Sequence, residues 1–186
     1  NVFEKCQTKS FAARAQQKDD GKKGKRAGSD FKRQLIEKQK LRLIYSLTEK
    51  QFASYVKGAL ESGESPSQHL FASLESRLDS FIYRTGLAAT RRAARQMAAH
   101  GHFTVNGRRV TVPSYKLALS DTVAMRDAMQ GSALYQGLDD KLKERAVPSW
   151  VQFDTEKKAG VMQGVPQYGE RDSIVDFGAV FEYYTR

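Results

Sequence analysis

Apolar side chains between residues 29 and 76 recur at intervals of three and four, which is the spacing of one face of an α-helix. The first helix is predicted to begin at Ser29 or Asp30, because either side chain can cap it. Its inward face is expected to consist of Leu35, Ile36, Gln39, Leu43 and Ile44. Two shorter helices follow, one capped by Thr48 and one over residues 67–76. The pattern therefore predicts a small helical domain over 29–76.

From Arg77 onward the pattern changes to two short helices and a hairpin. The first helix stops near Gly86, and the second is predicted to be capped by Thr90 and to end at Gly101. Two alternating segments, 103–105 and 110–112, flank Asn106-Gly107, which is the strongest short hairpin signal. This part of the chain is thus predicted to be a pair of helices followed by a β-hairpin.

The remaining segments indicate more strands and one more helix. Residues 121–124 are expected to form a third strand, and residues 134–145 a helix that ends before Pro148. Residues 150–153 and 161–165 read as strands on either side of a turn at 157–160. The tail over 174–184 is rich in aromatic and β-branched residues, so it is expected to pack against another part of the chain. The predicted fold class is α+β.

Positive charge is concentrated in the first two thirds of the chain. The net charge is +10, and the first 60 residues hold 15 Lys and Arg against 6 Asp and Glu, whereas the last 66 hold 8 against 11. Residues 1–28 are polar, glycine-containing and basic, so they are expected to form an extended arm. Such an asymmetric distribution is typical of a protein that binds a polyanion.

Arginines are the candidate binding groups after residue 77. Arg91 and Arg95 are four residues apart and share a helix face, while Arg92 lies about 100° around from Arg91. Arg108 and Arg109 flank the hairpin turn. Guanidinium groups bind phosphate through two hydrogen bonds and stay charged when partly desolvated. The pattern favours binding to a nucleic-acid backbone over binding of a small-molecule substrate.

The sequence offers little for catalysis, metal binding or membrane insertion. Cys6 is the only cysteine, and His100 and His102 have no carboxylate or thiol placed nearby to complete a metal site. No phosphate-binding glycine loop or catalytic triad pattern occurs, and no apolar run of about 18 residues could span a membrane. Asp79 lies in an Arg-Leu-Asp sequence similar to that of pseudouridine synthases, but the chain after Tyr115 is too short for their catalytic domain. We expect no enzymatic activity, no cofactor, no metal and no membrane partner.

The stretch RLDSFIYRTGLAATRRAARQMAAHGHFTVNGRRVTVPSY resembles the RNA-binding motif named after small-subunit ribosomal protein S-four. The upstream stretch EKQKLRLIYSLTEKQF and the closing FEYYTR resemble the helical domain and the C-terminus of the bacterial or organellar members of that family. The resemblance implies a helical domain over 29–76, completed by about 174–186, into which an RNA-binding domain over 77–173 is inserted. That inserted domain consists of the two-helix motif and a small antiparallel sheet.

The resemblance also implies a function. Members of this family bind small-subunit ribosomal RNA at a multi-helix junction early in assembly, lie near the messenger RNA entrance and adjoin proteins S-five and S-three. The positions that the family pattern places against RNA are Lys38, Lys40, Arg42, Arg77, Arg84, Arg91, Arg92, Arg95, His100, Arg108 and Arg109. The arm adds Lys22, Lys23, Lys25 and Arg26, and Tyr115 is expected to stack on a base or ribose.

One departure from the family pattern and two alternatives remain open at this stage. Many relatives bind zinc through paired cysteines near the N-terminus, and Cys6 alone cannot do so. The expected location is the cytoplasmic ribosome of a bacterium, with an organellar ribosome as the alternative. The same motif occurs in other RNA-binding proteins, so the alternative function is a free translational regulator or a ribosome-associated factor.

Overall fold

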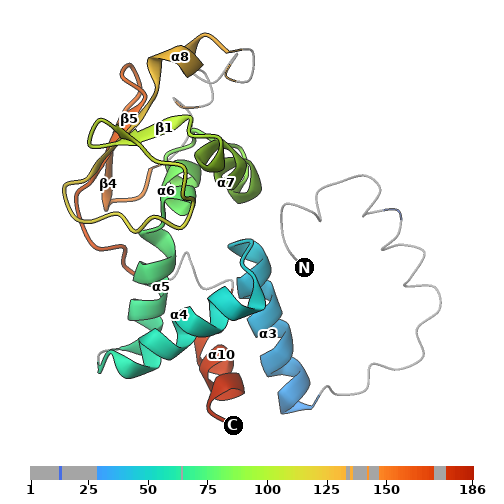
Figure 1. Ribbon diagram of the computed structural model, residues 1–186. Coiled ribbons are helices and arrows are strands. Elements are labelled where there is room, and N and C mark those ends of the chain that lie inside the picture. Colours follow the sequence, from blue (N-terminus) through green and yellow to red (C-terminus); the bar gives the residue numbers. More distant parts are fainter. Residues whose placement is uncertain are drawn as a thin grey trace. The chain divides into compact units, whose positions relative to one another are not determined.

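The computed structural model describes residues 13, 29–63, 65–132, 135, 142, 147–169 and 175–186 (Figure 1). The chain divides into two compact units. The first comprises the residues up to Leu60 together with those from Glu170 onward, and the second comprises Glu61–Gly169. The second unit is therefore inserted between the two segments of the first. The mixture of helices with an antiparallel sheet confirms the α+β class.

The first unit contains α3 (Asp30–Ile44), α4 (Glu49–Glu61) and α10 (Phe177–Tyr184). α3 begins where the sequence predicted, because the Ser29 hydroxyl accepts a hydrogen bond from the Lys32 amide at 3.4 Å. The Thr48 hydroxyl accepts from the Gln51 amide at the start of α4 in the same way. α10 packs along α3 within this unit.

The face that α3 buries differs from the predicted one. Gln34, Lys38 and Leu41 are buried, whereas Ile36 and Leu43 are 45% and 47% exposed. The reason lies in α10, which is far away in sequence: its Glu182 accepts a hydrogen bond from the Gln34 amide group at 2.9 Å. A polar stripe is buried because polar partners meet it, and this information is absent from the local hydrophobic pattern.

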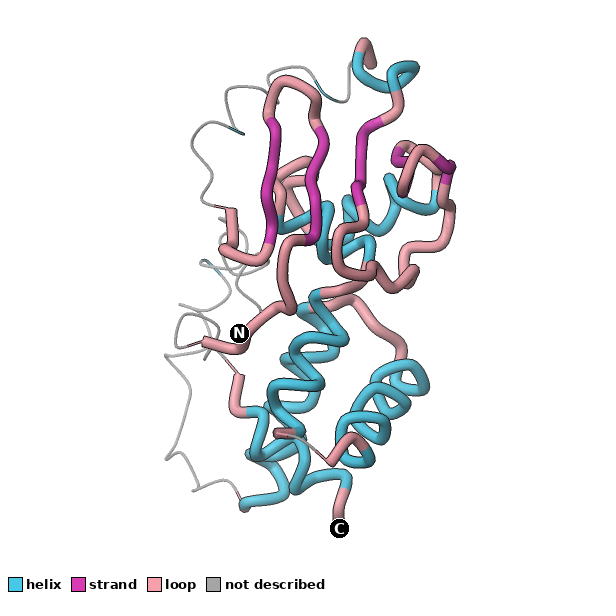
Figure 2. The backbone as a smooth tube through the Cα atoms, turned by 90° about the vertical axis from the view of Figure 1, so that its left-hand side faces the viewer, coloured by secondary structure: helices cyan, strands magenta, loops and turns pink. Residues whose placement is uncertain are grey.

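The second unit joins short helices to a sheet. Its elements are α5 (Pro66–Glu75), α6 (Leu78–Arg84), α7 (Arg91–Ala99), β1 (Phe103–Val105), β2 (Arg108–Arg109), β3 (Thr122–Met125), α8 (Asp127–Gln130), β4 (Val151–Asp154) and β5 (Ala159–Met162). Among the described residues the strands form one antiparallel sheet in the order β2-β1-β3-β5-β4, and Figure 2 distinguishes these strands from the helices by colour.

The hairpin turn is the predicted one, but its second strand starts earlier and is shorter than expected. Asn106 and Gly107 have φ of 49° and 77°, as a type I′ turn requires, so Val105 pairs directly with Arg108. The chain then leaves the sheet, so residues 110–112 are not a strand. The carbonyls of Pro113 and Tyr115 instead accept hydrogen bonds from the first amides of α6.

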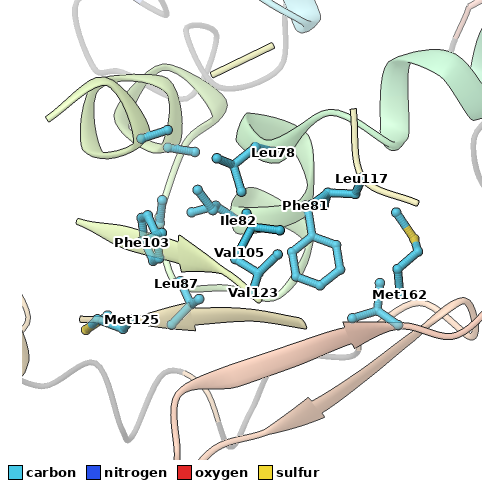
Figure 3. Packing of buried hydrophobic residues seen from close by; sticks show 14 of the residues in the cluster. Leu78, Phe81, Ile82, Leu87, Phe103, Val105, Leu117, Val123, Met125 and Met162 are labelled. Atoms are coloured by element: carbon cyan, nitrogen blue, oxygen red, sulfur yellow. The ribbon is translucent and has the colours of Figure 1, made fainter. Parts of the chain in front are cut away.

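The core of the second unit lies between the sheet and the pair α6–α7. Phe81 and Ile82 from α6 meet Phe103, Val105 and Val123 from the sheet, and all five side chains are almost completely buried (Figure 3). The fully buried residues that α7 contributes to this core are alanines, Ala94 and Ala98, and Met97 packs against it partly buried. Small side chains let the backbone of α7 approach α6 closely, so the long side chains of α7 emerge around the edge of that contact.

The boundary between the units differs from the expected one, because α5 belongs to the second unit. Phe71 of α5 packs edge-on against Trp150 and Tyr168, with ring centroids 6.0 and 5.6 Å apart. Gln68 adds hydrogen bonds to the backbone of the 166–168 segment. The predicted helix over 134–145 lies outside the described residues, apart from Tyr135 and Leu142.

Candidate nucleic-acid interface

α7 is capped and oriented so that part of its arginine-rich surface faces solvent. The Thr90 hydroxyl accepts a hydrogen bond from the Ala93 amide at 3.1 Å, which fixes the start of the helix as predicted. Ala94 and Ala98 define the buried side. Arg92, a little over half a turn from Ala94, is exposed. Its guanidinium is therefore available to a ligand.

Arg91 and Arg84 are directed inward rather than toward solvent, which corrects their assignment as simple RNA contacts. Both donate to Glu75, a residue whose side chain is fully shielded from water. Arg84 binds the Glu75 carboxylate through two hydrogen bonds of 2.9 and 2.8 Å, and Arg91 adds one of 2.9 Å. Arg91 also stacks over the Tyr83 ring at 4.4 Å. A buried carboxylate needs such partners, so these arginines hold the three helices together.

Arg77 is a second correction. It is only 1% exposed, and its guanidinium binds the Asp79 carboxylate at 2.9 and 2.6 Å. A group so enclosed cannot reach a nucleic acid. Asp79 also accepts from the Ser80 amide, and Arg95 approaches it at 3.5 Å with about a third of its side chain exposed. Arg95 thus keeps access to solvent, whereas Asp79 is 4% exposed and both of its carboxylate oxygens accept hydrogen bonds.

The hairpin supplies a second group of exposed cations beside the end of α7. Arg108 and Arg109 are exposed. The Arg109 guanidinium lies over Gly101 and donates to the His100 carbonyl at 3.0 Å, so the hairpin and the helix end are in direct contact. A β-carbon on Gly101 would lie 2.3 Å from the Arg109 Nε atom, and the glycine also has φ of +70°. Gly101 therefore ends the helix and makes room for the arginine.

Arg126 lies beside this group of cations, although the sequence alone did not single it out. It follows β3, and its guanidinium donates to the Gly101 carbonyl at 3.2 Å. His102 lies beside it and shares a hydrogen bond of 2.8 Å with the Tyr135 hydroxyl. Burial lowers the pKa of His102, and the nearby positive charges of His100, Arg126 and Arg109 lower it further. The signal that could have revealed Arg126 was the pairing of β1 with β3. This pairing aligns Phe103 with Met125, the residue before Arg126, and so brings Arg126 close to the end of α7.

The candidates in the first unit have mostly local partners. Lys38 is 5% exposed, donates to Glu49 at 2.7 Å and lies 4.4 Å from the centre of the Tyr183 ring, so it is structural and its assignment to RNA is corrected. Arg42 donates to the Gln39 side-chain oxygen, and Lys40 forms an ion pair with Glu37. Both remain partly exposed.

The exposed candidates of the second unit therefore come from α7, the hairpin and the segment after it. They are Arg92, His100, Arg108, Arg109 and Tyr115, the last of which is 40% exposed, together with the partly exposed Arg95. We call this set, without Tyr115, the α7–hairpin surface. Lys22, Lys23, Lys25 and Arg26 of the expected arm lie outside the described residues.

The other classes of site to consider in the described residues are a metal site and a membrane-spanning helix. No group of three or more His, Cys, Asp or Glu side chains in that part of the chain is arranged to hold a metal ion. No helix among those residues is long and apolar enough to cross a membrane.

The second unit contains two short helices in contact, α6 and α7, followed by a tight hairpin, and exposed arginines lie on α7 and on the hairpin. These features define the unit as an RNA-binding module. Comparison with known families agrees, since residues 76–123 match the S4 domain and residues 2–75 match the ribosomal protein S4/S9 N-terminal domain. Together these matches cover residues 2–123, which end within β3.

Curated relatives extend the similarity over most of the molecule. The chain is 39% identical to small ribosomal subunit protein uS4 of Levilactobacillus brevis, over 90% of this chain and 83% of that protein. It is 40% identical to uS4 of Lactiplantibacillus plantarum, over 89% and 81%, and 40% identical to uS4 of Mycobacterium tuberculosis, over 85% and 79%. The chain belongs to the uS4 family of small ribosomal subunit proteins.

Proposed function

We propose that this protein is a structural component of the small ribosomal subunit that binds small-subunit ribosomal RNA. One observation carries the proposal: the α7–hairpin surface gathers exposed arginines at the junction of a helix and a hairpin. In the described part of the chain, neither Arg92 nor Arg108 nor Arg109 has a carboxylate within ion-pair distance. Unpaired guanidinium groups on a rigid element are suited to phosphate.

The proposed activity is binding and assembly, without catalysis. The docking site is a multi-helix junction of the ribosomal RNA, and binding there early in assembly nucleates the body of the subunit. Recognition rests on the shape of the folded RNA and on its phosphates, because arginines on a convex helix and a hairpin reach the backbone more readily than base edges. The enclosed Asp79 supports the absence of a base-modifying reaction.

The protein partners and the location are part of the same proposal. Neighbouring proteins in the subunit are S-five and S-three, and the bound protein contributes to the messenger RNA entrance region. The cytoplasmic ribosome of a bacterium is the proposed location, which the bacterial origin of the relatives supports. An organellar ribosome is the alternative.

The test is binding of the full chain to the 5′ domain of small-subunit ribosomal RNA in a filter-binding titration, with an unrelated folded RNA of equal length as the control. Preferential binding to the ribosomal RNA, and sedimentation of the tagged protein with small-subunit particles from cells, are the expected results. Equal binding to both RNAs would contradict the proposal. Sedimentation with messenger RNA instead of the small subunit would favour the alternative, a free translational regulator.

A further inference from the structure

Two arginines, Arg109 of β2 and Arg126 immediately after β3, converge on the C-terminal end of α7. Arg109 donates to the His100 carbonyl at 3.0 Å, and Arg126 donates to the next carbonyl, that of Gly101, at 3.2 Å. The backbone of Arg126 is fixed as well, because its amide donates to the His102 carbonyl at 3.0 Å. Both guanidinium groups are thus held at consecutive residues of the same turn.

The register of the sheet explains why these two residues meet there. β1 lies between β2 and β3, so its neighbours on both sides approach the point where α7 ends. Thr104 of β1 pairs with Arg109 on one side and with Ala124 on the other, and cross-strand partners share one face of a sheet. Arg126, two residues beyond Ala124, follows on the same side of the sheet.

The cluster is rich in positive charge for its size. His100 and His102, at the end of α7 and just after it, have ring centroids 6.0 Å apart. Within the residues that the structure describes, no carboxylate comes within ion-pair distance of Arg109 or Arg126. Each guanidinium donates to a backbone carbonyl, and that bond uses one of the five N–H groups that a guanidinium carries.

We propose that Arg109 and Arg126 together bind a single RNA phosphate at the C-terminal end of α7. The carbonyl contacts orient the two guanidinium groups before RNA arrives, and the remaining N–H groups donate to the phosphate oxygens. This inference rests on the proposed function and adds to it a specific phosphate site and one new contact residue, Arg126.

The competing explanation is that the two arginines only cap the helix. Cations stabilise a helix C-terminus through the macrodipole, and that role needs no ligand. The two explanations differ in what they predict for binding. A cap affects folding alone, whereas a shared phosphate site couples the two arginines in the affinity and in its dependence on salt.

The experiment measures binding of the full chain to the 5′ domain of small-subunit ribosomal RNA over a series of KCl concentrations. The variants are Arg126→Gln, which keeps a donor for the Gly101 carbonyl, Arg109→Gln, and the double variant. Each single change is expected to weaken binding about tenfold, the effect of one charge-assisted hydrogen-bond partner. The double variant is expected to weaken binding much less than a hundredfold and to flatten the salt slope by about 0.7–0.9, the value for one phosphate.

A matched control pairs Arg126→Gln with Arg92→Ala, whose side chain lies on the exposed surface of α7. The effects of these two changes on affinity should multiply, because separate sites act independently. Arg126→Lys retains the charge without the planar fork, so it should keep the wild-type slope while losing part of the affinity.

Three results would overturn the inference. The first is Arg126→Gln with a lower melting temperature but unchanged affinity and slope, which is the behaviour of a helix cap. The second is full multiplication of the Arg126 and Arg109 effects, which would mean separate phosphates. The third is a wild-type protein that does not prefer this RNA, which would overturn the proposed function along with the site. If the wild type prefers this RNA but Arg126→Gln changes neither the affinity nor the salt slope, only the phosphate site is overturned and the proposed function stands.

Discussion

The guanidinium of Arg91 donates a hydrogen bond of 2.9 Å to Glu75, whose carboxylate is completely shielded from water. The same carboxylate accepts two hydrogen bonds from Arg84. Glu75 ends α5, Arg84 ends α6 and Arg91 begins α7, so one buried negative charge ties three helices together. This contact sets the rotation of α7 and thereby decides that Arg92, not Arg91, faces solvent.

Removing the buried carboxylate should therefore destabilise the second unit. Glu75→Gln leaves Arg84 and Arg91 without a compensating charge, and the expected loss in the free energy of unfolding is about 3 kcal/mol, measured by urea denaturation. The exposed Glu156, in the same unit, provides a control, because Glu156→Gln should change this free energy by less than about 0.5 kcal/mol. Equal effects of the two changes would show that the buried network contributes little.

Adjacent arginines of α7 should respond in opposite ways to substitution. Arg92→Ala is expected to flatten the slope of log affinity against log salt by up to about 0.9 with no loss of folding stability, because its side chain is exposed. Arg91→Ala is expected to lower the urea midpoint, because it removes a partner of Glu75. Filter binding and urea denaturation on both variants check this, and a reversed pattern would mean that the helix is rotated from the orientation described.

Lys38 should behave as a structural residue despite its charge. Lys38→Ala removes the contact with Glu49 and with the Tyr183 ring, and the expected cost is about 2 kcal/mol of unfolding free energy, with an unchanged salt slope for RNA binding. Lys32, exposed on the same helix, is the matched control, since Lys32→Ala should leave stability unaltered. A flattened slope for Lys38→Ala at constant stability would restore its assignment to RNA.

The cap of α10 should make the helical unit sensitive to acid. The Ala179 amide and then the Arg33 guanidinium, both hydrogen-bonded to Asp176, hold the pKa of that carboxyl below its ordinary value of 3.8, with burial opposing them. A depressed folded pKa adds stability above the unfolded pKa, and this stability is lost as pH falls through the folded pKa. Asp176→Ala should cost about 1 kcal/mol at neutral pH and progressively less below pH 4.

Thermal unfolding followed by circular dichroism between pH 2.5 and 7 measures this effect. Asp176→Asn serves as the control, because asparagine still caps a helix but cannot titrate. A difference between wild type and Asp176→Ala that stays constant down to pH 2.5 would rule out the carboxylate as its source.

Features set by neighbouring residues were predictable from the sequence. The caps at Ser29, Thr48 and Thr90 and the turn at Asn106-Gly107 depend on side chains within three residues, and all four are present in the structure. The family resemblance and the α+β class were predictable for a related reason, since they rest on a continuous motif.

Features set by distant partners were not predictable. Lys38 looked like an RNA contact, but its surroundings include Tyr183, which is far along the chain. Arg77 and Arg91 belonged to an arginine-rich motif, and only the packing of the helices shows that Asp79 and Glu75 enclose them. Charge patterns count cations, whereas the fold decides which cations are already neutralised.

The central claim is that an exposed cationic surface binds the phosphates of small-subunit ribosomal RNA. The most direct measurement is the salt dependence of wild-type binding to the 5′ domain of that RNA, compared with a variant in which Arg92, Arg95, Arg108 and Arg109 are all alanine. If each arginine neutralises one phosphate, the wild-type slope should be steeper than the variant slope by about 3. Equal slopes, with both proteins folded by circular dichroism, would contradict the account.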